Sequence, residues 1–408
     1  SAFEGCSGLT SITISDGVTT IGDSAFEGCS GLTGVTIGNS VTSIDYRAFY
    51  GCTDLTSVTI PNSVTTIGYS AFSGCTGLKS IIIGSGVTSI GSGAFGGCTG
   101  LTEIAVDENN PGYCASDGVL FDKSKSQIIR YPQGISMREY TIPDGVRSIG
   151  YGAFENCTDL TSVTIPDSVK SIGKHAFYNC ESLISITIPD SVTSIGGSAF
   201  EGCSGLTSVT IPDSVTTLSS YAFYECRNLA SVIIGNGITT IGSFAFNRCG
   251  LTSLTIPDSV TNIDAWAFCG CRNLTSITIP DSVTTIGDDA FYFTSIKDVY
   301  YKGSEQDRAK MHIANGNSSF LNATWHYNGD TTDPAVIEID VTIPDYQKGG
   351  TVMAALYDES DTLIGIKSYP PAETVKVSFE QSGAYIKVLQ WDMTTMKPLA
   401  PPQNIKVN

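Results

Sequence analysis

Histidine and charged residues are scarce in this sequence of 408 residues. It has 3 histidines, and Asp, Glu, Lys and Arg together make up 15% of the chain. So few histidines leave little material for a histidine-based active site or metal centre. The charge that is present is mostly acidic, with 40 Asp and Glu against 22 Lys and Arg. Because nucleic-acid binding depends on Lys and Arg at phosphates, this balance disfavours a nucleic-acid partner.

Long apolar runs are missing as well. The sequence has no stretch of about 18 consecutive apolar residues, which predicts no membrane span. Hydrophobic residues still make up 41% of the chain, enough to form a core. The sequence begins in the middle of a repeated motif, because the residues from Ser1 to Cys6 return at Ser24 and at Ser198. We therefore expect a fragment or a processed chain. Its first residue says nothing about the targeting of the full protein.

That motif recurs at a period of 23 residues over most of the chain. The pair Ala-Phe marks each copy, and it returns in phase except for one step of 22 residues and one gap of 59 between Ala94 and Ala153. The gap equals one repeat plus 36 extra residues. A unit of this length cannot bury its own apolar face, so copies must stack to form one continuous core.

The unit that begins at Leu55 shows how one copy is built. Val58 and Ile60 are two residues apart, so they share one face of a short strand. Pro61-Asn62 supplies a turn, and Ala71-Phe72 predicts a tight helical or 3₁₀ turn that enters the core. Stacking then aligns the strands into a parallel sheet. The predicted fold class is a β-rich α/β solenoid with short helical turns.

The word I-P-x-S-V-T-x-I-G-x-x-A-F-x-x-C-x-x-L resembles the BspA-type leucine-rich repeats of bacterial surface proteins, over residues 1–328. The resemblance implies a leucine-rich repeat solenoid in a non-enzymatic adhesin, anchored or secreted. It implies an extracellular or cell-surface location and a host or neighbouring-cell protein as partner. The alternative is an accessory region, binding glycan or protein, of a larger secreted enzyme. We expect a monomer without a cofactor.

Two segments interrupt or end the repeat. The insertion at 107–141 holds two apolar runs around a polar Asp-Lys-Ser-Lys-Ser turn, which predicts a β-hairpin. The repeat motif is no longer recognisable after Phe291. Residues 295–328 are expected to cap the open end of the core. Alternating runs in 329–408 predict a small antiparallel β-sandwich. This last segment resembles a module that ends many secreted clostridial-type proteins.

Most of the 13 cysteines are in phase with the repeat. Each would have two equivalent neighbours about 4.8 Å away, too far for a disulfide, so we expect buried thiols that pack as small apolar side chains. The in-phase positions are Cys6, Cys29, Cys52, Cys75, Cys98, Cys157, Cys180, Cys203, Cys226, Cys249 and Cys271. Such a ladder offers no tetrahedral ligand group, and no metal site is predicted.

Two other patterns have simple explanations. The stretch from Gly91 to Gly96 matches G-x-G-x-x-G, but no strand–helix unit surrounds it, so we assign its glycines to the bend and turn of the repeat. Asp residues follow Pro in successive turns, as at Asp167 and Asp190. They form either a solvated row or a loose site for divalent cations.

No catalytic motif is present, so candidate partner-binding residues are sought where the repeat is broken. Outward strand positions are mostly Ser and Thr, a pattern that suits stacked strands or a hydroxyl-rich recognition face. Glu103, Tyr113, Arg130 and Tyr131 are large or charged where the repeat would place small hydroxyls. We expect them to bind a partner near the insertion or to brace it. Exposed aromatics clustered on one face would instead favour a glycan-binding module.

Overall fold

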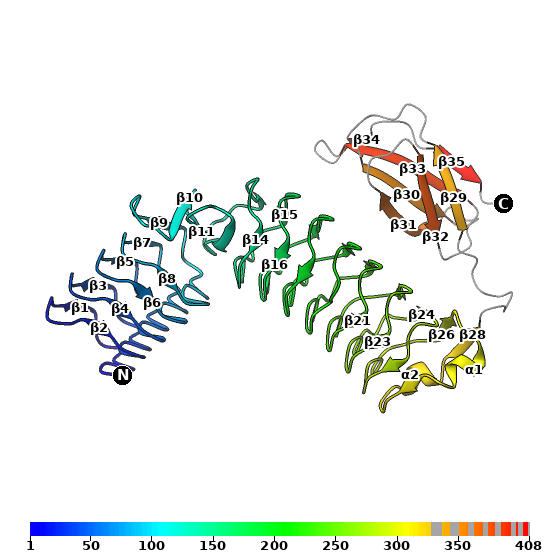
Figure 1. Ribbon diagram of the computed structural model, residues 1–408, viewed down its shortest axis with the longest axis horizontal. Coiled ribbons are helices and arrows are strands. Elements are labelled where there is room, and N and C mark those ends of the chain that lie inside the picture. Colours follow the sequence, from blue (N-terminus) through cyan, green and yellow to red (C-terminus); the bar gives the residue numbers. More distant parts are fainter. Residues whose placement is uncertain are drawn as a thin grey trace. The chain divides into compact units, whose positions relative to one another are not determined.

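The structure is a computed structural model of the chain. It describes residues 1–327 and, beyond them, the backbone of β29 (Ile337–Thr342), β30 (Thr351–Tyr357), β31 (Leu363–Tyr369), β32 (Thr374–Phe379), β33 (Tyr385–Asp392), β34 (Lys397–Pro398) and β35 (Gln403–Lys406). The chain divides into two compact units, Ser1–Asn328 and Gly329–Asn408. In the first unit the coils follow one another in a single row from the blue end to the yellow end (Figure 1).

Each of the first four coils contributes one strand to each of two parallel sheets, and the coil that enters the insertion contributes β9 (Glu103–Val106) to the first sheet alone. The first sheet pairs residues one repeat apart, as Ser57 with Ser80, and consists of β1 (Ser11–Ile14), β3 (Gly34–Ile37), β5 (Ser57–Ile60), β7 (Ser80–Ile83) and β9. The second consists of β2 (Thr20–Ile21), β4 (Ser43–Ile44), β6 (Thr66–Ile67) and β8 (Ser89–Ile90). The period predicts the first sheet, whereas the second is a finding of the structure.

The same two rows of strands resume at the end of the insertion, with β13 (Glu139–Thr141), and continue beyond it. The first row comprises β13, β15 (Ser162–Thr164), β17 (Ser185–Ile186), β19 (Ser208–Ile211), β20 (Ser231–Ile234), β22 (Ser253–Thr255), β24 (Ser276–Ile279), β26 (Asp298–Tyr301) and β28 (Thr324–Tyr327). The second comprises β14 (Ser148–Ile149), β16 (Ser171–Ile172), β18 (Ser194–Ile195), β21 (Thr240–Ile241), β23 (Asn262–Ile263), β25 (Thr285–Ile286) and β27 (His312–Ile313). Alternate residues of these strands point into the core, as in Ser208–Ile211, where Val209 and Ile211 are buried.

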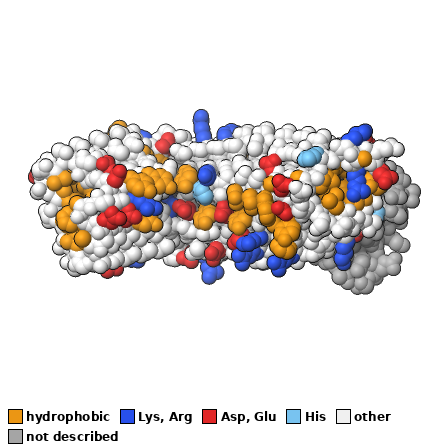
Figure 2. Space-filling view, turned by 90° about the horizontal axis from the view of Figure 1, so that it is seen from below, with side chains coloured by type: hydrophobic (Ala, Val, Ile, Leu, Met, Phe, Trp, Pro, Cys, Tyr) orange, Lys and Arg blue, Asp and Glu red, His pale blue; other side chains and the backbone are white. Residues whose placement is uncertain are grey.

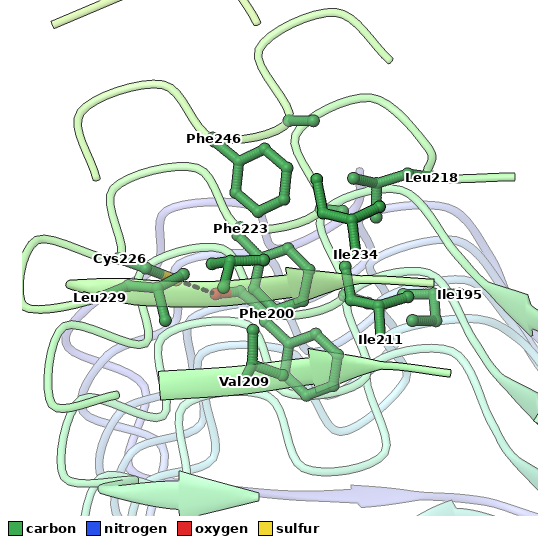
Figure 3. Packing of buried hydrophobic residues seen from close by; sticks show 14 of the residues in the cluster. Ile195, Phe200, Val209, Ile211, Leu218, Phe223, Cys226, Leu229, Ile234 and Phe246 are labelled. Atoms are coloured by element: carbon green, nitrogen blue, oxygen red, sulfur yellow. Dashed lines mark hydrogen bonds between the residues drawn. The ribbon is translucent and has the colours of Figure 1, made fainter. Parts of the chain in front are cut away.

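The Ala-Phe turns supply the centre of the core. The rings of Phe200 and Phe223 stack with centroids 5.1 Å apart, and those of Phe223 and Phe246 with centroids 5.5 Å apart (Figure 3). The Cys226 thiol donates to the Phe200 carbonyl oxygen at 3.1 Å, which fixes sulfur against the preceding turn. Burying one Phe side chain contributes about 1.5–3 kcal/mol. The predicted burial of the Phe and Cys ladders is confirmed from Phe26 and Cys29 onward. The first copy is an exception, because Phe3 and Cys6 stand at the open end of the stack and are exposed.

The turn itself is not the helical or 3₁₀ segment that the sequence predicts. It is a run of tight turns, in which Ala71 N–H donates to Gly68 and Ser73 N–H donates to Ser70. Ser70 has a φ of 53°, in the left-handed region, so the backbone cannot continue as a right-handed helix.

The insertion contains the predicted hairpin and one strand more. β11 (Val119–Asp122) and β12 (Gln127–Arg130) pair antiparallel around the polar turn, and β10 (Tyr113–Ser116) pairs antiparallel with β11. Asp117 and Gly118 join β10 to β11 with φ values of 52° and 78°. Two positive φ values and an Asp-Gly pair are typical of a type I′ hairpin turn. β12 then pairs in parallel with β14 and starts the second row again.

The insertion also separates two hydrophobic cores. Leu120 packs in the core before it, whereas Val119 and Phe121 pack in the core after it. Successive residues of a strand point to opposite faces, so β11 is a shared wall between the two cores. We call the coils of 1–106 the N-terminal stack and those of 142–327 the C-terminal stack.

The segment after Phe291 closes the described stack. It contains α1 (Glu305–Arg308) and α2 (Ser318–Leu321), and Ser304 caps α1 by accepting a hydrogen bond from Asp307 N–H. The Phe320 ring stacks on the Phe291 ring at 4.5 Å and so extends the Phe ladder. The Arg308 guanidinium lies 4.0 Å from the centroid of the Trp325 ring, a cation–π contact within the cap.

The second unit is antiparallel in its described strands. β29 pairs with β32, and β31, β30 and β33 pair in that order. These strands lie within 329–408, the range whose alternating runs predict antiparallel strands. The sandwich packing of the sheets stays a prediction. Among the described residues of both units, no helix is long and apolar enough to cross a membrane.

Candidate functional site beside the insertion

The hydrogen-bond ladder between Ala-Phe turns stops at the insertion. In a regular coil, the N–H groups of Ser70, Phe72 and Gly74 donate to carbonyl oxygens of the next turn at 3.2, 2.8 and 2.8 Å. The equivalent N–H groups one coil later, those of Gly93, Phe95 and Gly97, donate to no carbonyl of the following segment. Backbone donors therefore face a gap in the stack instead of a neighbouring turn.

A cavity of about 380 Å³ lies in this gap. Its walls come from the turn at 91–96, from strands β10 to β12 of the insertion, and from the next turn at 150–155. Gly93 and Gly96 leave room where the equivalent residues of an earlier coil are Arg47 and Tyr50. These glycines belong to the turn of the repeat, as expected. Because Gly93 and Gly96 have no side chains, the space that Arg and Tyr would fill stays open as part of the cavity.

Arg130 is the most deeply buried charged residue of the cavity wall, with 6% of its side chain exposed. Its Nη1 donates to the Gly152 carbonyl oxygen at 2.6 Å and lies 3.5 Å from Glu155 Oε2. Its Nε and Nη2 have no hydrogen-bond partner in the structure. Buried guanidinium donors without partners are costly, which marks this side chain as unusual in a repeat core.

Glu155 and Tyr151 also line the cavity, and they come from the turn that follows the insertion. The Glu155 side chain is 24% exposed, and Tyr151 is exposed at the surface. Burial raises the pKa of the Tyr151 phenol, and the neighbouring Tyr69 and Glu155 add to the increase. The Tyr151 phenol is therefore neutral at physiological pH and presents a donor near a carboxylate.

The structure brings two of the four predicted binding residues to this cavity. Arg130 and Tyr113 both line it. The Tyr113 hydroxyl accepts a hydrogen bond from Ile90 N–H at 3.1 Å, so it also replaces the missing strand partner of β8. Glu103 is exposed on β9 and is not in the cavity wall.

Tyr131 has a core position instead of a surface one. It is 1% exposed, and its ring stacks on the Phe154 ring at 5.2 Å, one repeat before the regular ladder resumes. Its N–H donates to Ala153, as a ladder Phe does. Arg130 and Tyr131 therefore take the places of Ala and Phe in a degenerate coil. The expectation that Tyr131 contacts a partner needs this correction, because its side chain braces the core.

Sequence reasoning did not select Tyr151, Glu155 or Gln127, which also line the cavity. Tyr151 and Glu155 occupy variable positions of a regular unit, so only the adjacent interruption distinguishes them. One feature of the sequence could have predicted the positions of Arg130 and Tyr131. Tyr131 precedes Phe154 by one repeat of 23 residues, so Arg130 and Tyr131 align with the buried pair Ala153 and Phe154.

The cysteine thiols of the ladder have low reactivity. Burial raises the pKa of Cys52 and Cys271 to about 12, and that of Cys98 to about 11 with Arg130 opposing the increase. Because the thiolate is the reactive form, these side chains are poor nucleophiles and poor metal ligands near neutral pH. In the part of the chain that the structure describes, no three His, Cys, Asp or Glu residues are grouped to hold a metal ion.

A second feature is a row of exposed and half-buried aromatic side chains beside the Ala-Phe turns of the C-terminal stack, the aromatic row. Tyr221 and Phe244 stack at 4.7 Å, and Phe244 and Trp266 stack at 5.7 Å, so ring edges rather than ring faces meet solvent. The row consists of Tyr221, Tyr224, Phe244, Trp266, Tyr292 and Phe293. Figure 2 shows hydrophobic side chains gathered along the middle of one face, between charges of both signs.

Comparisons with known proteins agree with the observed fold. Residues 1–112, 131–236 and 195–307 match the family model of the BspA type leucine-rich repeat region, in six copies. A leucine-rich repeat protein from Eubacterium ventriosum is similar at 33% identity and a TM-score of 0.69, over 72% of this chain and 79% of that one. Another from Bacteroides ovatus has 30% identity and a TM-score of 0.50, over 80% and 85%. No curated protein matches the chain.

Proposed function

Because this chain belongs to the BspA type leucine-rich repeat family, we propose that it is a non-enzymatic binding protein that adheres to other proteins outside the cell or at its surface. Leucine-rich repeat proteins typically mediate protein binding or adhesion. The partner class, the location and the absence of catalysis are parts of the proposal. So is a monomeric state, which size-exclusion chromatography with light scattering would test.

The aromatic row is the observation that carries this proposal. Clustered exposed aromatics would otherwise favour a glycan-binding module, but these rings stack on one another, so few ring faces are free to stack on sugar rings. Cores of protein interfaces are enriched in Tyr, Trp, Phe and Arg. Here the rings of consecutive coils form one continuous strip, with Arg272 lying 5.9 Å from the centroid of the Phe293 ring. Phe293 is 57% exposed, which is unusual for a large apolar side chain without a partner. A protein that buries this strip would gain apolar contact over several coils.

The test is a binding screen against immobilised extracellular-matrix proteins, followed by comparison of two double variants. Tyr221→Ala with Phe293→Ala removes two exposed members of the row, and we expect at least a tenfold loss of affinity for any ligand found. The control, Thr59→Ala with Thr210→Ala, changes exposed hydroxyls on β5 and β19 and should leave affinity within about twofold. Loss of binding in the control alone would move the interface to the strand face and contradict the proposal.

A further inference from the structure

The cavity beside the insertion offers hydrogen-bond donors that the fold does not use. Arg130 lines the cavity, and its Nε and Nη2, which lie along one edge of the guanidinium, are buried and have no partner. A ligand that reaches this edge can bind both atoms with two neighbouring oxygen atoms. The N–H groups of Gly93 and Phe95 belong to the cavity wall and make no ladder bond. A ligand for this cavity must therefore carry several oxygen acceptors that lie close to one another.

Acceptors are present in the same wall. The Glu155 carboxylate reaches the cavity from the next turn, and the Gln127 amide carries both an acceptor and a donor. Glu155 Oε2 would lie 3.4 Å from a Cβ atom placed on Gly96, so the carboxylate sits against the glycine-lined side. The Glu155 carboxylate already faces Arg130 Nη1 at 3.5 Å, but its remaining acceptor capacity is unused, so a hydroxyl group can donate to it and accept from Arg130.

Charge argues against a simple anion. Asp122 and Glu155 both line the cavity and outnumber the single cation, Arg130. Like charges at close range repel more strongly in a partly desolvated site than in water. A phosphate or a free carboxylate would approach two carboxylates to reach one guanidinium, so a neutral ligand is favoured.

Shape and apolar surface narrow the class further. A volume of about 380 Å³ lies within the usual range for small-molecule sites, and the rings of Tyr113 and Tyr151 form part of the wall. Vicinal hydroxyls on a ring with apolar C–H faces match a guanidinium edge, a carboxylate and aromatic side chains together. We propose that this cavity binds a neutral sugar residue of a glycan. The proposal rests on the proposed function in taking the chain as a binding protein, and it adds a second class of ligand.

The experiment measures binding of neutral saccharides to the full chain by isothermal titration calorimetry, after a glycan array has selected the probes. Gly96→Tyr places a tyrosine where Tyr50 stands in an earlier coil, and it fills the cavity without a strained φ. Arg130→Met keeps the length of the side chain and removes the donors. We expect each variant to weaken binding at least tenfold, with the fold checked by circular dichroism and melting.

The matched control is Glu201→Tyr. Glu201 occupies the same position of its coil as Gly96 but lies outside the cavity wall, and the residues at this position of the two adjacent coils are Tyr178 and Tyr224. It should bind the saccharide as the unchanged chain does. Glucuronic acid and inorganic phosphate serve as charged probes, and both should bind at least tenfold more weakly than the neutral saccharide.

Three outcomes would overturn the proposal. These are no binding of any neutral saccharide, unchanged binding by folded Gly96→Tyr, or preference for phosphate or the acidic sugar. Protein binding through the aromatic row with no saccharide binding would contradict this inference alone and leave the proposed function intact. Saccharide binding at the cavity with no protein ligand found would support this inference and contradict the proposed function.

Discussion

The turns at Phe72 and Phe95 have nearly the same sequence and different surroundings. Ala71-Phe72-Ser-Gly-Cys75 is followed by a coil in register, and its N–H groups bond to that coil. Ala94-Phe95-Gly-Gly-Cys98 is followed by the insertion, and the N–H groups of Gly93 and Phe95 belong to the wall of a cavity. In regular coils the backbone N–H groups of each turn are used to hold the next turn. Where the repeat is interrupted, the same kind of N–H groups have no such partner and are available to a ligand. Regular coils and the interrupted one should therefore respond differently to changes of pH and to substitution.

The largest expected effect comes from raising the pH, because it acts on many ladder thiols together. Burial raises the pKa of Cys52 and Cys271 from 9.0 to about 12 in the folded chain. Above about pH 9 the unfolded chain loses these protons and the folded chain keeps them, so stability is full below pH 9 and falls toward pH 12. Each such thiol costs about 1.4 kcal/mol per pH unit in that window.

Urea unfolding at pH 8 and pH 10 measures this dependence. A Cys180→Ala, Cys203→Ala variant should show a shallower decline, since burial raises the pKa of both thiols. Cys6→Ala is the control, because Cys6 is exposed. Equal slopes in all three proteins would argue against buried ladder thiols. Reaction with a thiol reagent should likewise detect few groups in the native chain and close to all 13 after denaturation.

Phe200→Ala is expected to be the most damaging single substitution of a regular coil. Phe200 is fully buried between the rings of Phe177 and Phe223, so its loss opens a cavity and should cost about 3–5 kcal/mol. Each repeat contacts only its neighbours, so hydrogen exchange should rise mainly in adjacent coils. The free energy of unfolding from urea titration is the measurement. An unchanged midpoint would be incompatible with the inward position of the Ala-Phe turn.

Asn110→Ala is expected to have a smaller effect, centred on the interruption. The Asn110 amide donates to the Gly84 and Val87 carbonyl oxygens at 2.8 and 3.0 Å, and its oxygen accepts from Gly112 and Tyr113 N–H. It replaces a ladder Val and satisfies the backbone where strand pairing ends. Its removal should cost about 2–3 kcal/mol by leaving buried groups unpaired. Asn109→Ala, at an exposed neighbour, should cost less than about 0.5 kcal/mol.

Periodicity predicts the regular coils well, since each apolar position repeats in every copy and stacking leaves it one inward direction. The second row of strands is harder to foresee, because Thr66-Ile67 is too short to show alternation. Asp117-Gly118 is a hairpin signal that could have located β10. The cavity could not be predicted from residue types, because it depends on which N–H groups find no partner. Phe320 joins the ladder out of period, which only packing reveals.

Tyr131→Phe is expected to have the smallest effect, and its sign is informative. Tyr131 stands in the ladder position of Phe, and its buried hydroxyl has no hydrogen-bond partner. Burial raises the pKa of this phenol, with Cys157 and Tyr140 adding to the increase, so the group is held neutral. Removing an unpaired buried hydroxyl should leave stability unchanged or raise it by up to about 1 kcal/mol. Phe154→Tyr places the same hydroxyl in the next, regular turn and should cost about 1–3 kcal/mol. If Tyr131→Phe instead destabilises the chain by more than 1 kcal/mol in urea unfolding, the hydroxyl has a partner and the degenerate coil is held together by polar contacts.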